Sequence, residues 1–165
     1  IFGALVSHGS STVPKYIVDE INAMGGELTN TYGISIEELK AAIPAGISKI
    51  NVDTDIRLAV TRNMKELFAK YPEKRTSASI GPIYELLETK KNQFDPRVFL
   101  PPIMDTVMYG NVPDEDVAAI VSCVERGVKE VVGTLIVEFG SFGKAPLVEQ
   151  VSLDEMAERY KKMEK

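Results

Sequence analysis

The sequence contains one cysteine, one histidine and no tryptophan in its 165 residues. A single cysteine, Cys123, excludes an internal disulfide and fits a reducing compartment, so we expect a cytoplasmic protein. No apolar run is long enough to cross a bilayer, and no basic leader precedes the short apolar run at 2–6. On these grounds we expect neither a membrane protein nor a secreted protein.

Basic residues are too few and too scattered to form a nucleic-acid-binding face. The chain has 19 Lys and Arg against 24 Asp and Glu, which gives a net charge of −5 at pH 7. A protein held to nucleic acid through its phosphates needs the opposite balance. With 44% hydrophobic and 26% charged residues, the composition is that of an ordinary globular domain able to bury a core.

The chain changes character near Pro72. Before this proline, short apolar runs predict strands and amphipathic stretches predict helices, in the order strand 2–6, helix 14–24, helix 35–44, strand 48–52 and helix 55–70. This alternation is typical of a parallel α/β sheet with right-handed crossovers. The second helix begins with a capping box, Ser35-Ile36-Glu37-Glu38.

The sequence of residues 72–165 predicts helices connected by loops. Pro101-Pro102 must bend or end the helix that starts at Asp95-Pro96. The longest predicted helix, 114–139, carries apolar residues at helical spacing: Val117, Ile120, Val121, Val124, Val128, Val131, Val132, Leu135 and Ile136. Cys123 lies beside this stripe and is expected to be a packed thiol, and a last helix is predicted from Ser152.

Two parallel strands need neighbours, because such sheets bury both faces. A closed eight-stranded barrel takes about 250 residues, more than this sequence holds. We therefore interpret residues 1–71 as the last two βα units of a (β/α)8 TIM barrel, an α/β fold. Residues 72–165 would be a helical C-terminal extension of the same domain and a subunit-interface region. The chain starts with Ile1 instead of Met, which fits a piece of a longer polypeptide.

Both predicted strands are followed by small polar residues, at 7–11 and 51–55. In parallel α/β folds the carboxyl ends of the strands form the ligand site. The two-residue alternation of a strand places His8 and Asn51 at the same rim if these sides face the barrel interior. His8 suits a metal ligand at this position. Zinc needs three or four ligands, so the other ligands would have to come from elsewhere.

A phosphate could bind beside this rim. Gly9 allows close backbone approach, and the hydroxyl groups of Ser10 and Ser11 supply donors, although the same residues also suit an ordinary loop. Asp53-Thr54-Asp55 is first of all a helix N-cap in which an acid or Thr side chain accepts from free amides. Main-chain N–H groups at this helix start could equally bind an anion.

The order of these motifs resembles the C-terminal portion of class II, zinc-dependent fructose-bisphosphate aldolases. The resemblance is close from Leu5 to Lys70 and is carried by His8-Gly9-Ser10-Ser11 together with Lys49-Ile50-Asn51-Val52-Asp53-Thr54-Asp55. Phe94-Asp95-Pro96-Arg97 and Phe139-Gly140-Ser141 are similar to segments nearer the C-terminus of that family.

The resemblance implies reversible cleavage of fructose 1,6-bisphosphate to dihydroxyacetone phosphate and glyceraldehyde 3-phosphate through a zinc-stabilised enediolate. It implies that His8 is one of three zinc-binding histidines and that Asn51 is catalytic, touching substrate near the enediolate. The phosphate of the dihydroxyacetone half would be bound by Gly9, Ser11, Asp53 and Thr54. Gly9 and Ser11 would also hold a monovalent cation, K⁺ or Na⁺.

Two arginines are implied for the other phosphate. Arg57 matches a binding position, and in some family members Arg97 reaches this phosphate from a neighbouring subunit of a homodimer or homotetramer. The arginine fork suits two phosphate oxygens at once. Residues 74–93 and 109–117 look longer than is usual in the family, which puts the part played by Arg97 in doubt.

The other zinc histidines and the proton-transferring acid are absent from this sequence, so the chain alone is not expected to catalyse. Three alternatives stay open. Lys49 could form a Schiff base with the substrate. The substrate could be tagatose bisphosphate, which differs in one hydroxyl configuration. The chain could also belong to a non-catalytic homologue that binds a sugar phosphate.

Overall fold

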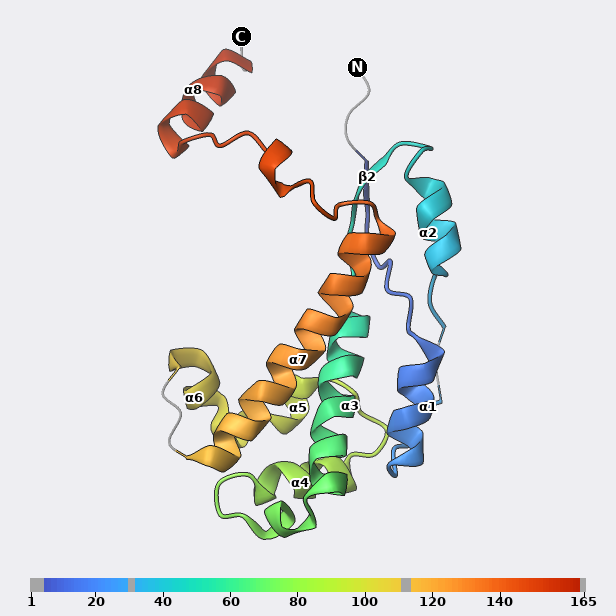
Figure 1. Cartoon of the computed structure of the whole chain (residues 1–165), viewed down its shortest axis with the longest axis vertical. Coiled ribbons are helices and arrows are strands. Elements are labelled where there is room, and N and C mark those ends of the chain that lie inside the picture. The colour runs from blue at the N-terminus through green and yellow to red at the C-terminus, as the bar shows by residue number, and fades with distance from the viewer. Residues whose placement is uncertain (1–4, 30–31, 111–113, 164–165) are drawn as a thin grey trace.

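Two short parallel strands lie at one end of the molecule and most of the helices at the other (Figure 1). The computed structural model describes residues 5–29, 32–110 and 114–163. Strands β1 (Leu5–Ser7) and β2 (Ile47–Ile50) pair in parallel, with Val6 opposite Lys49. Between them in the chain come α1 (Lys15–Ala23) and α2 (Ile36–Ala42). The predicted strand–helix order is confirmed.

The strand boundaries differ from the prediction. Residues 2–4 of the first predicted strand lie outside the described part of the chain. The second strand ends at Ile50 instead of Val52, because the chain turns there toward the start of the next helix at Asp53. Within the described residues the sheet has two strands, so the fold seen is a partial α/β fold. Closure into a barrel stays a prediction.

The remaining elements are helical, as predicted. The capping box at Ser35 is confirmed, since its hydroxyl accepts from the Glu38 amide and the Glu38 carboxylate accepts from the Ser35 amide. Among the described residues after β2, the structure has α3 (Thr54–Lys70), α4 (Gly81–Thr89), α5 (Pro96–Phe99), α6 (Met104–Tyr109), α7 (Glu115–Glu138) and α8 (Leu153–Met163), with short 3₁₀ turns at Pro72–Thr76, Pro101–Ile103 and Ala145–Leu147.

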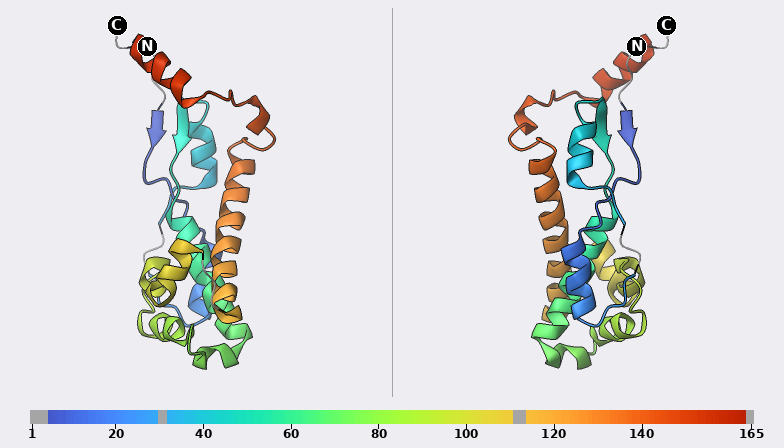
Figure 2. Two further views of the ribbon diagram at one scale, coloured as in Figure 1. Left: turned by 90° about the vertical axis from the view of Figure 1, so that its left-hand side faces the viewer. Right: turned by 90° about the vertical axis from the view of Figure 1, so that its right-hand side faces the viewer.

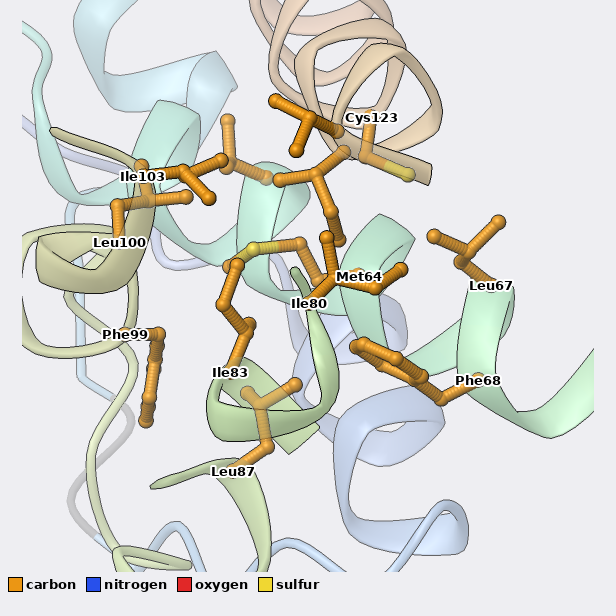
Figure 3. Packing of buried hydrophobic residues seen from close by; sticks show 13 residues of the cluster. Met64, Leu67, Phe68, Ile80, Ile83, Leu87, Phe99, Leu100, Ile103 and Cys123 are labelled. Carbon is orange, nitrogen blue, oxygen red and sulfur yellow. The ribbon is translucent and has the colours of Figure 1, made fainter. Parts of the chain in front are cut away.

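Helix α3 lies at the centre of the helical part, with α7 alongside it (Figures 1 and 2). Figure 3 shows the larger buried cluster, whose side chains come from both sides of Pro72. Its members are Val60, Met64, Leu67, Phe68, Ile80, Ile83, Leu87, Phe99, Leu100, Ile103, Val117, Ile120 and Cys123. A second cluster joins α1 to the other face of α3 and to Val131 of α7. Residues before and after Pro72 therefore share one core.

The predicted apolar stripe of α7 is only partly buried. Val128, Val132 and Ile136 are 38–40% exposed, whereas Cys123 and Gly127 are buried. Val117, Ile120 and Val131 of the predicted stripe are buried, and the contact line between them runs through Cys123 and Gly127. Sequence periodicity does not count a glycine as apolar, although Gly127 is where α7 approaches α3 closely. A Cβ added at Gly127 would lie 2.8 Å from the Val60 backbone nitrogen.

Cys123 is a packed thiol, as predicted. Its Sγ donates to the backbone carbonyl oxygen of Asn63 at 3.4 Å. The side-chain amide of Asn63 donates to the backbone carbonyl oxygen of Cys123 at 3.1 Å. Burial raises the pKa of the Cys123 thiol, which makes the thiolate scarce and the group unreactive.

Helix α8 stands apart from the helical core in Figure 1 and buries no residue. Its amphipathic sequence therefore has no partner within the described residues. None of the described helices is long and apolar enough to cross a membrane.

We predict opposite effects for two glycine substitutions in α7. Gly127→Ala should lower the free energy of unfolding by about 1–3 kcal/mol, because the new methyl group meets the backbone of α3. The methyl group of Gly133→Ala would have nothing within 4 Å. This variant should raise the free energy of unfolding by about 0.5–1 kcal/mol, because alanine has the higher helix propensity. Urea unfolding of the two variants beside the parent measures both. Equal effects at the two positions would contradict the close contact of α3 and α7.

Candidate active site

The two strand ends stay paired beyond the last residue of each strand. The backbone amide of Asn51 donates to the backbone carbonyl of Ser7 at 3.0 Å, and the backbone amide of Ser10 donates to the backbone carbonyl of Asn51 at 3.2 Å. This pairing brings the side chains of His8 and Asn51 together, with 3.0 Å between Nδ1 of His8 and Nδ2 of Asn51. Their predicted juxtaposition at one rim is confirmed.

Lys49 completes a row of three side chains at this rim. Its Nζ donates to Oδ1 of Asn51 at 2.6 Å, while Nδ2 of the same amide faces His8. Lys49, Asn51 and His8 are all solvent-accessible in the described structure. We refer to them below as the rim row.

The start of α3 is capped by a side chain of the loop that follows β1. Ser11 Oγ accepts from the amides of Asp53 and Thr54 at 3.1 and 3.0 Å, whereas the Asp53 side chain makes no capping bond. The predicted cap by an acid or Thr side chain at the helix start is therefore wrong. The reason is tertiary, because the acceptor comes from about forty residues earlier in the chain. A phosphate can reach these two amides only by replacing the Ser11 hydroxyl.

Asp55 anchors the same loop from inside. Its side chain is buried, and its carboxylate accepts from the Thr12 amide at 3.0 Å, the Thr12 hydroxyl at 2.8 Å and the Val13 amide at 2.8 Å. Val13 has φ +50°, which is unusual for a β-branched residue and needs such support. The sequence predicts Asp55 only as part of the helix cap, since no local pattern reveals a partner so distant in the chain.

A hollow of about 520 Å³ opens between the two strand ends. Its lining residues are Gly9, Ser11, Ile50, Asn51, Val52, Asp53 and Thr54. Gly9 has φ +63°, a conformation that favours glycine, and a Cβ added there would meet nothing within 4 Å. The structure thus gathers five of the predicted site residues around one space that is open on the Gly9 side.

The two predicted phosphate-binding arginines share one carboxylate. Arg57 Nη1 donates to Asp95 Oδ2 at 3.0 Å, and Arg97 Nε donates to both Asp95 oxygens at 3.0 Å. The other nitrogens of Arg57 bind Asp53, which lines the hollow. The sequence predicts Asp95 only at the start of a helix, where its carboxylate does accept from the Arg97 backbone amide. Its pairing with both arginines was not foreseen.

Asp95 is held as a carboxylate by these partners. Its side chain is 19% exposed. Hydrogen bonds from Arg97, with the charges of Arg57 and Arg97, hold the pKa of Asp95 below its ordinary value despite the opposing effect of burial. The same pairing raises the pKa of Arg97. Two guanidinium groups are thereby held on one carboxylate, whose negative charge offsets part of their mutual repulsion.

The described residues can supply only part of a zinc site. They contain no group of three His, Cys, Asp or Glu side chains that could hold a metal ion. His8 is an accessible imidazole at a strand end, which fits one zinc ligand. Ser11 brings an oxygen donor of the kind that hard cations prefer to the same hollow. A complete zinc site would need ligands from outside these residues.

Comparison with known proteins identifies the family. Residues 2–144 match the family described as class-II fructose-bisphosphate aldolase. The chain belongs to this family. A fructose-bisphosphate aldolase of Xanthobacter flavus is 35% identical over 156 residues, which cover 94% of this chain and 33% of that protein. A fructose-bisphosphate aldolase of Giardia intestinalis is 34% identical over 157 residues, covering 95% of this chain and 36% of that protein.

A relative of Synechocystis named fructose-bisphosphate aldolase class 2 is 33% identical over 160 residues, covering 97% of this chain and 33% of that protein. The chain thus spans about a third of the length of these relatives. The family resemblance seen in the sequence is confirmed over nearly the whole chain.

We predict that Asp55→Ala destabilises the chain by about 3 kcal/mol, because three donors lose a buried charged acceptor. Asp19→Ala is the control, since its pair with Lys15 is exposed and should contribute less than about 0.5 kcal/mol. Denaturant unfolding with circular dichroism detection compares them. A loss at Asp55 as small as that at Asp19 would contradict the anchoring role.

The lowered pKa of Asp95 predicts a pH dependence. A carboxyl group whose pKa is lower in the folded state stabilises the fold above its unfolded pKa of about 3.9, and this stability is lost as the pH falls through the folded value. Asp95→Asn should therefore lose less Tm than the parent on acidification from about pH 5 to pH 2.5. Scanning calorimetry of the variant beside the parent chain measures this. A steeper loss for Asp95→Asn would refute the interpretation.

Proposed function

We propose that the complete polypeptide of this chain cleaves fructose 1,6-bisphosphate reversibly into dihydroxyacetone phosphate and glyceraldehyde 3-phosphate. One observation carries the proposal. A class II aldolase chain presents a hollow at two parallel strand ends, with Asn51, Ser11 and the start of α3 around it and His8 at its rim. We further propose that the two βα units complete a (β/α)8 barrel with the rest of that polypeptide, since paired parallel strands need cover on both faces.

His8 would hold zinc as one of its ligands in this proposal. Bound zinc supplies a Lewis acid that polarises the substrate carbonyl group. Asn51 lines the hollow and carries an amide that can donate to a substrate oxygen as negative charge develops there. Asn51 is therefore the residue of this chain that we assign to catalysis.

The phosphate of the dihydroxyacetone half would bind at the Ser11 end of the hollow. Gly9, Ser11, Asp53 and Thr54 line this end, and two helix-start amides are already aimed at the Ser11 hydroxyl. Helix N-termini favour anions through such amides. The Ser11 hydroxyl and the chain at Gly9 would also serve a monovalent cation, K⁺ or Na⁺, which offsets phosphate charge.

Arg57 would bind the second phosphate. Its Nε and Nη2 face the exposed Asp53 carboxylate, whereas Nη1 stays on the less exposed Asp95. A phosphate could therefore replace Asp53 while Asp95 keeps the guanidinium in place. Arg97, on the same carboxylate, is proposed to serve this phosphate within a homodimer or homotetramer in which residues 72–165 contribute to the interface.

The rival mechanism through a Schiff base on Lys49 is less favoured. The Lys49 ammonium donates to Asn51, and membership of a class II family favours a metal-dependent reaction. Borohydride trapping with substrate tests it, because a stable adduct on Lys49 would replace the zinc proposal. Tagatose bisphosphate as substrate, and binding of a sugar phosphate without catalysis, are the two further outcomes that an assay with both sugars separates.

We predict that a chimaera is active in which this chain replaces the matching third of the Xanthobacter flavus relative. It should cleave fructose 1,6-bisphosphate, lose the activity to a chelator and regain it with zinc. Asn51→Leu in the chimaera should lower kcat at least about a hundredfold while zinc content is kept, since one preorganised donor to developing charge is lost. The coupled assay of glyceraldehyde 3-phosphate measures both.

The parent relative is the positive control for this assay, and circular dichroism checks that each chimaera is folded. A folded, zinc-loaded chimaera that binds dihydroxyacetone phosphate without cleaving either sugar would replace the proposal by the non-catalytic alternative. Full activity of Asn51→Leu would remove Asn51 from catalysis.

A further inference from the structure

A cavity of about 240 Å³ lies among the end of α1, the later turns of α3, the turn at Pro72–Thr76 and α4. We refer to it below as the α3–α4 cavity, and its lining includes Lys65, Phe68, Arg75, Tyr84, Leu87 and Glu88. Among the described residues, none lines both this cavity and the hollow at the strand ends. Lys65 lies about three helical turns after the start of α3, or about 16 Å along the helix axis. The α3–α4 cavity is therefore a separate space.

Lys65 carries a positive charge that has little to balance it. The residue is 5% exposed, and its Nζ donates to the Met24 carbonyl oxygen at 3.4 Å, a long distance for such a bond. An ammonium group has three donors, and within the described residues this bond is the one it makes. Burial lowers the pKa of Lys65, as expected for a buried ammonium group.

Arg75 brings a second positive charge to the same cavity. Its Nε donates to the Phe68 carbonyl oxygen at 2.9 Å, and its guanidinium carbon lies 5.2 Å from the centre of the Tyr84 ring. These contacts fix the guanidinium group without neutralising its charge. No carboxylate of the described residues lies within 4 Å of the charged nitrogens of Lys65 or Arg75. Two cations thus line the α3–α4 cavity without a direct acidic partner.

The charges around the cavity favour the binding of an anion. Glu88 is the one acid of its lining, and its charge raises the pKa of Lys65 against the larger effect of burial. Lys91 acts in the direction of burial and adds a further positive charge. An anion between Lys65 and Arg75 would accept charge-assisted hydrogen bonds and offset the surplus of positive charge.

The walls favour an anion with an apolar part. Phe68 and Leu87 belong to the buried cluster shown in Figure 3, and the Tyr84 ring packs on Phe68 with 5.3 Å between ring centres. The cavity is just smaller than the range of about 300–1,000 Å³ that is common for ligand pockets, so it suits a small molecule. A carboxylate carries its charge at one end of an apolar chain, whereas an inorganic phosphate has no apolar part to place on these walls.

We propose that the α3–α4 cavity binds a small monocarboxylate, whose carboxylate group pairs with Lys65 and Arg75 and whose apolar chain lies against Phe68, Tyr84 and Leu87. This ligand is distinct from the sugar phosphate proposed for the hollow. The proposal depends on the residues of the cavity alone, so it stands or falls independently of aldol cleavage.

The first test uses sodium butanoate as the probe. NMR titration of the isotopically labelled chain should show saturable shifts of the amides around Lys65 and in α4, with a Kd in the millimolar range expected for so small a ligand. Nuclear Overhauser effects between the butanoate methyl group and the side chains of Tyr84 and Leu87 should locate it. Effects to residues of the hollow instead would overturn the proposal.

Two further probes separate the contributions of charge and apolar contact. Butan-1-ol keeps the chain and lacks the charge, and inorganic phosphate keeps a charge and lacks the chain. Each should bind at least about tenfold more weakly than butanoate, since one charge-assisted hydrogen bond or the apolar contact is lost. Equal binding of butan-1-ol would show that the cations play no part. Equal binding of phosphate would show an adventitious ion only. Either outcome overturns the proposal.

Variants of α3 complete the test. Lys65→Met removes the charge at similar length and should weaken butanoate binding at least about tenfold. Lys70→Met is the matched control, because Lys70 is an exposed lysine of the same helix outside the cavity lining, and its affinity should equal that of the parent. Circular dichroism should show both variants folded, since Lys65→Met removes a buried charge that has no acidic partner.

Ala69→Leu tests the cavity while both cations stay in place. Ala69 is exposed and lines the cavity, so a larger side chain there should occupy part of the space and weaken butanoate binding. This variant also keeps the proposal testable if Lys65→Met does not fold. Parent-like affinity in a folded Lys65→Met chain, or in both Lys70→Met and Ala69→Leu, would overturn the proposal.

Discussion

The contact between the loop after β1 and the first turn of α3 is the constraint on which the site depends. Asp55 holds the loop from the buried side through Thr12 and Val13, and Ser11 returns a hydroxyl to the amides at the helix start. The loop thus supplies donors to the buried Asp55 carboxylate, and the Ser11 hydroxyl supplies an acceptor to the free amides of the helix start. The hollow, the rim row and the proposed phosphate position all lie around this junction.

Helix α3 connects this junction to the core. Its first turn borders the hollow, and its later turns carry Val60, Met64 and Phe68 into the cluster shared with α4, α5 and α7. The close approach at Gly127 places α7 directly on α3. A change in how α7 packs therefore acts on the helix that presents Arg57 and Asp55, although α7 contributes nothing to the lining of the hollow.

Charge is arranged in pairs beside the hollow. Arg57 and Arg97 carry positive charge at the proposed position of a second phosphate, and Asp95 offsets part of that charge while it fixes their directions. A guanidinium that keeps one partner while it exchanges another loses little order on binding a ligand.

The sequence by itself determined the element order, the capping box at Ser35, the family and the meeting of His8 with Asn51, because these follow from local patterns and the two-residue period of strands. Tertiary structure decided the rest. Ser11 in place of Asp53 as the helix cap, Asp95 as the partner of Arg57 and Gly127 as the contact of α7 all join residues far apart in the chain. Local propensity carries no information on such partners, since it is their positions in the folded chain that bring them together.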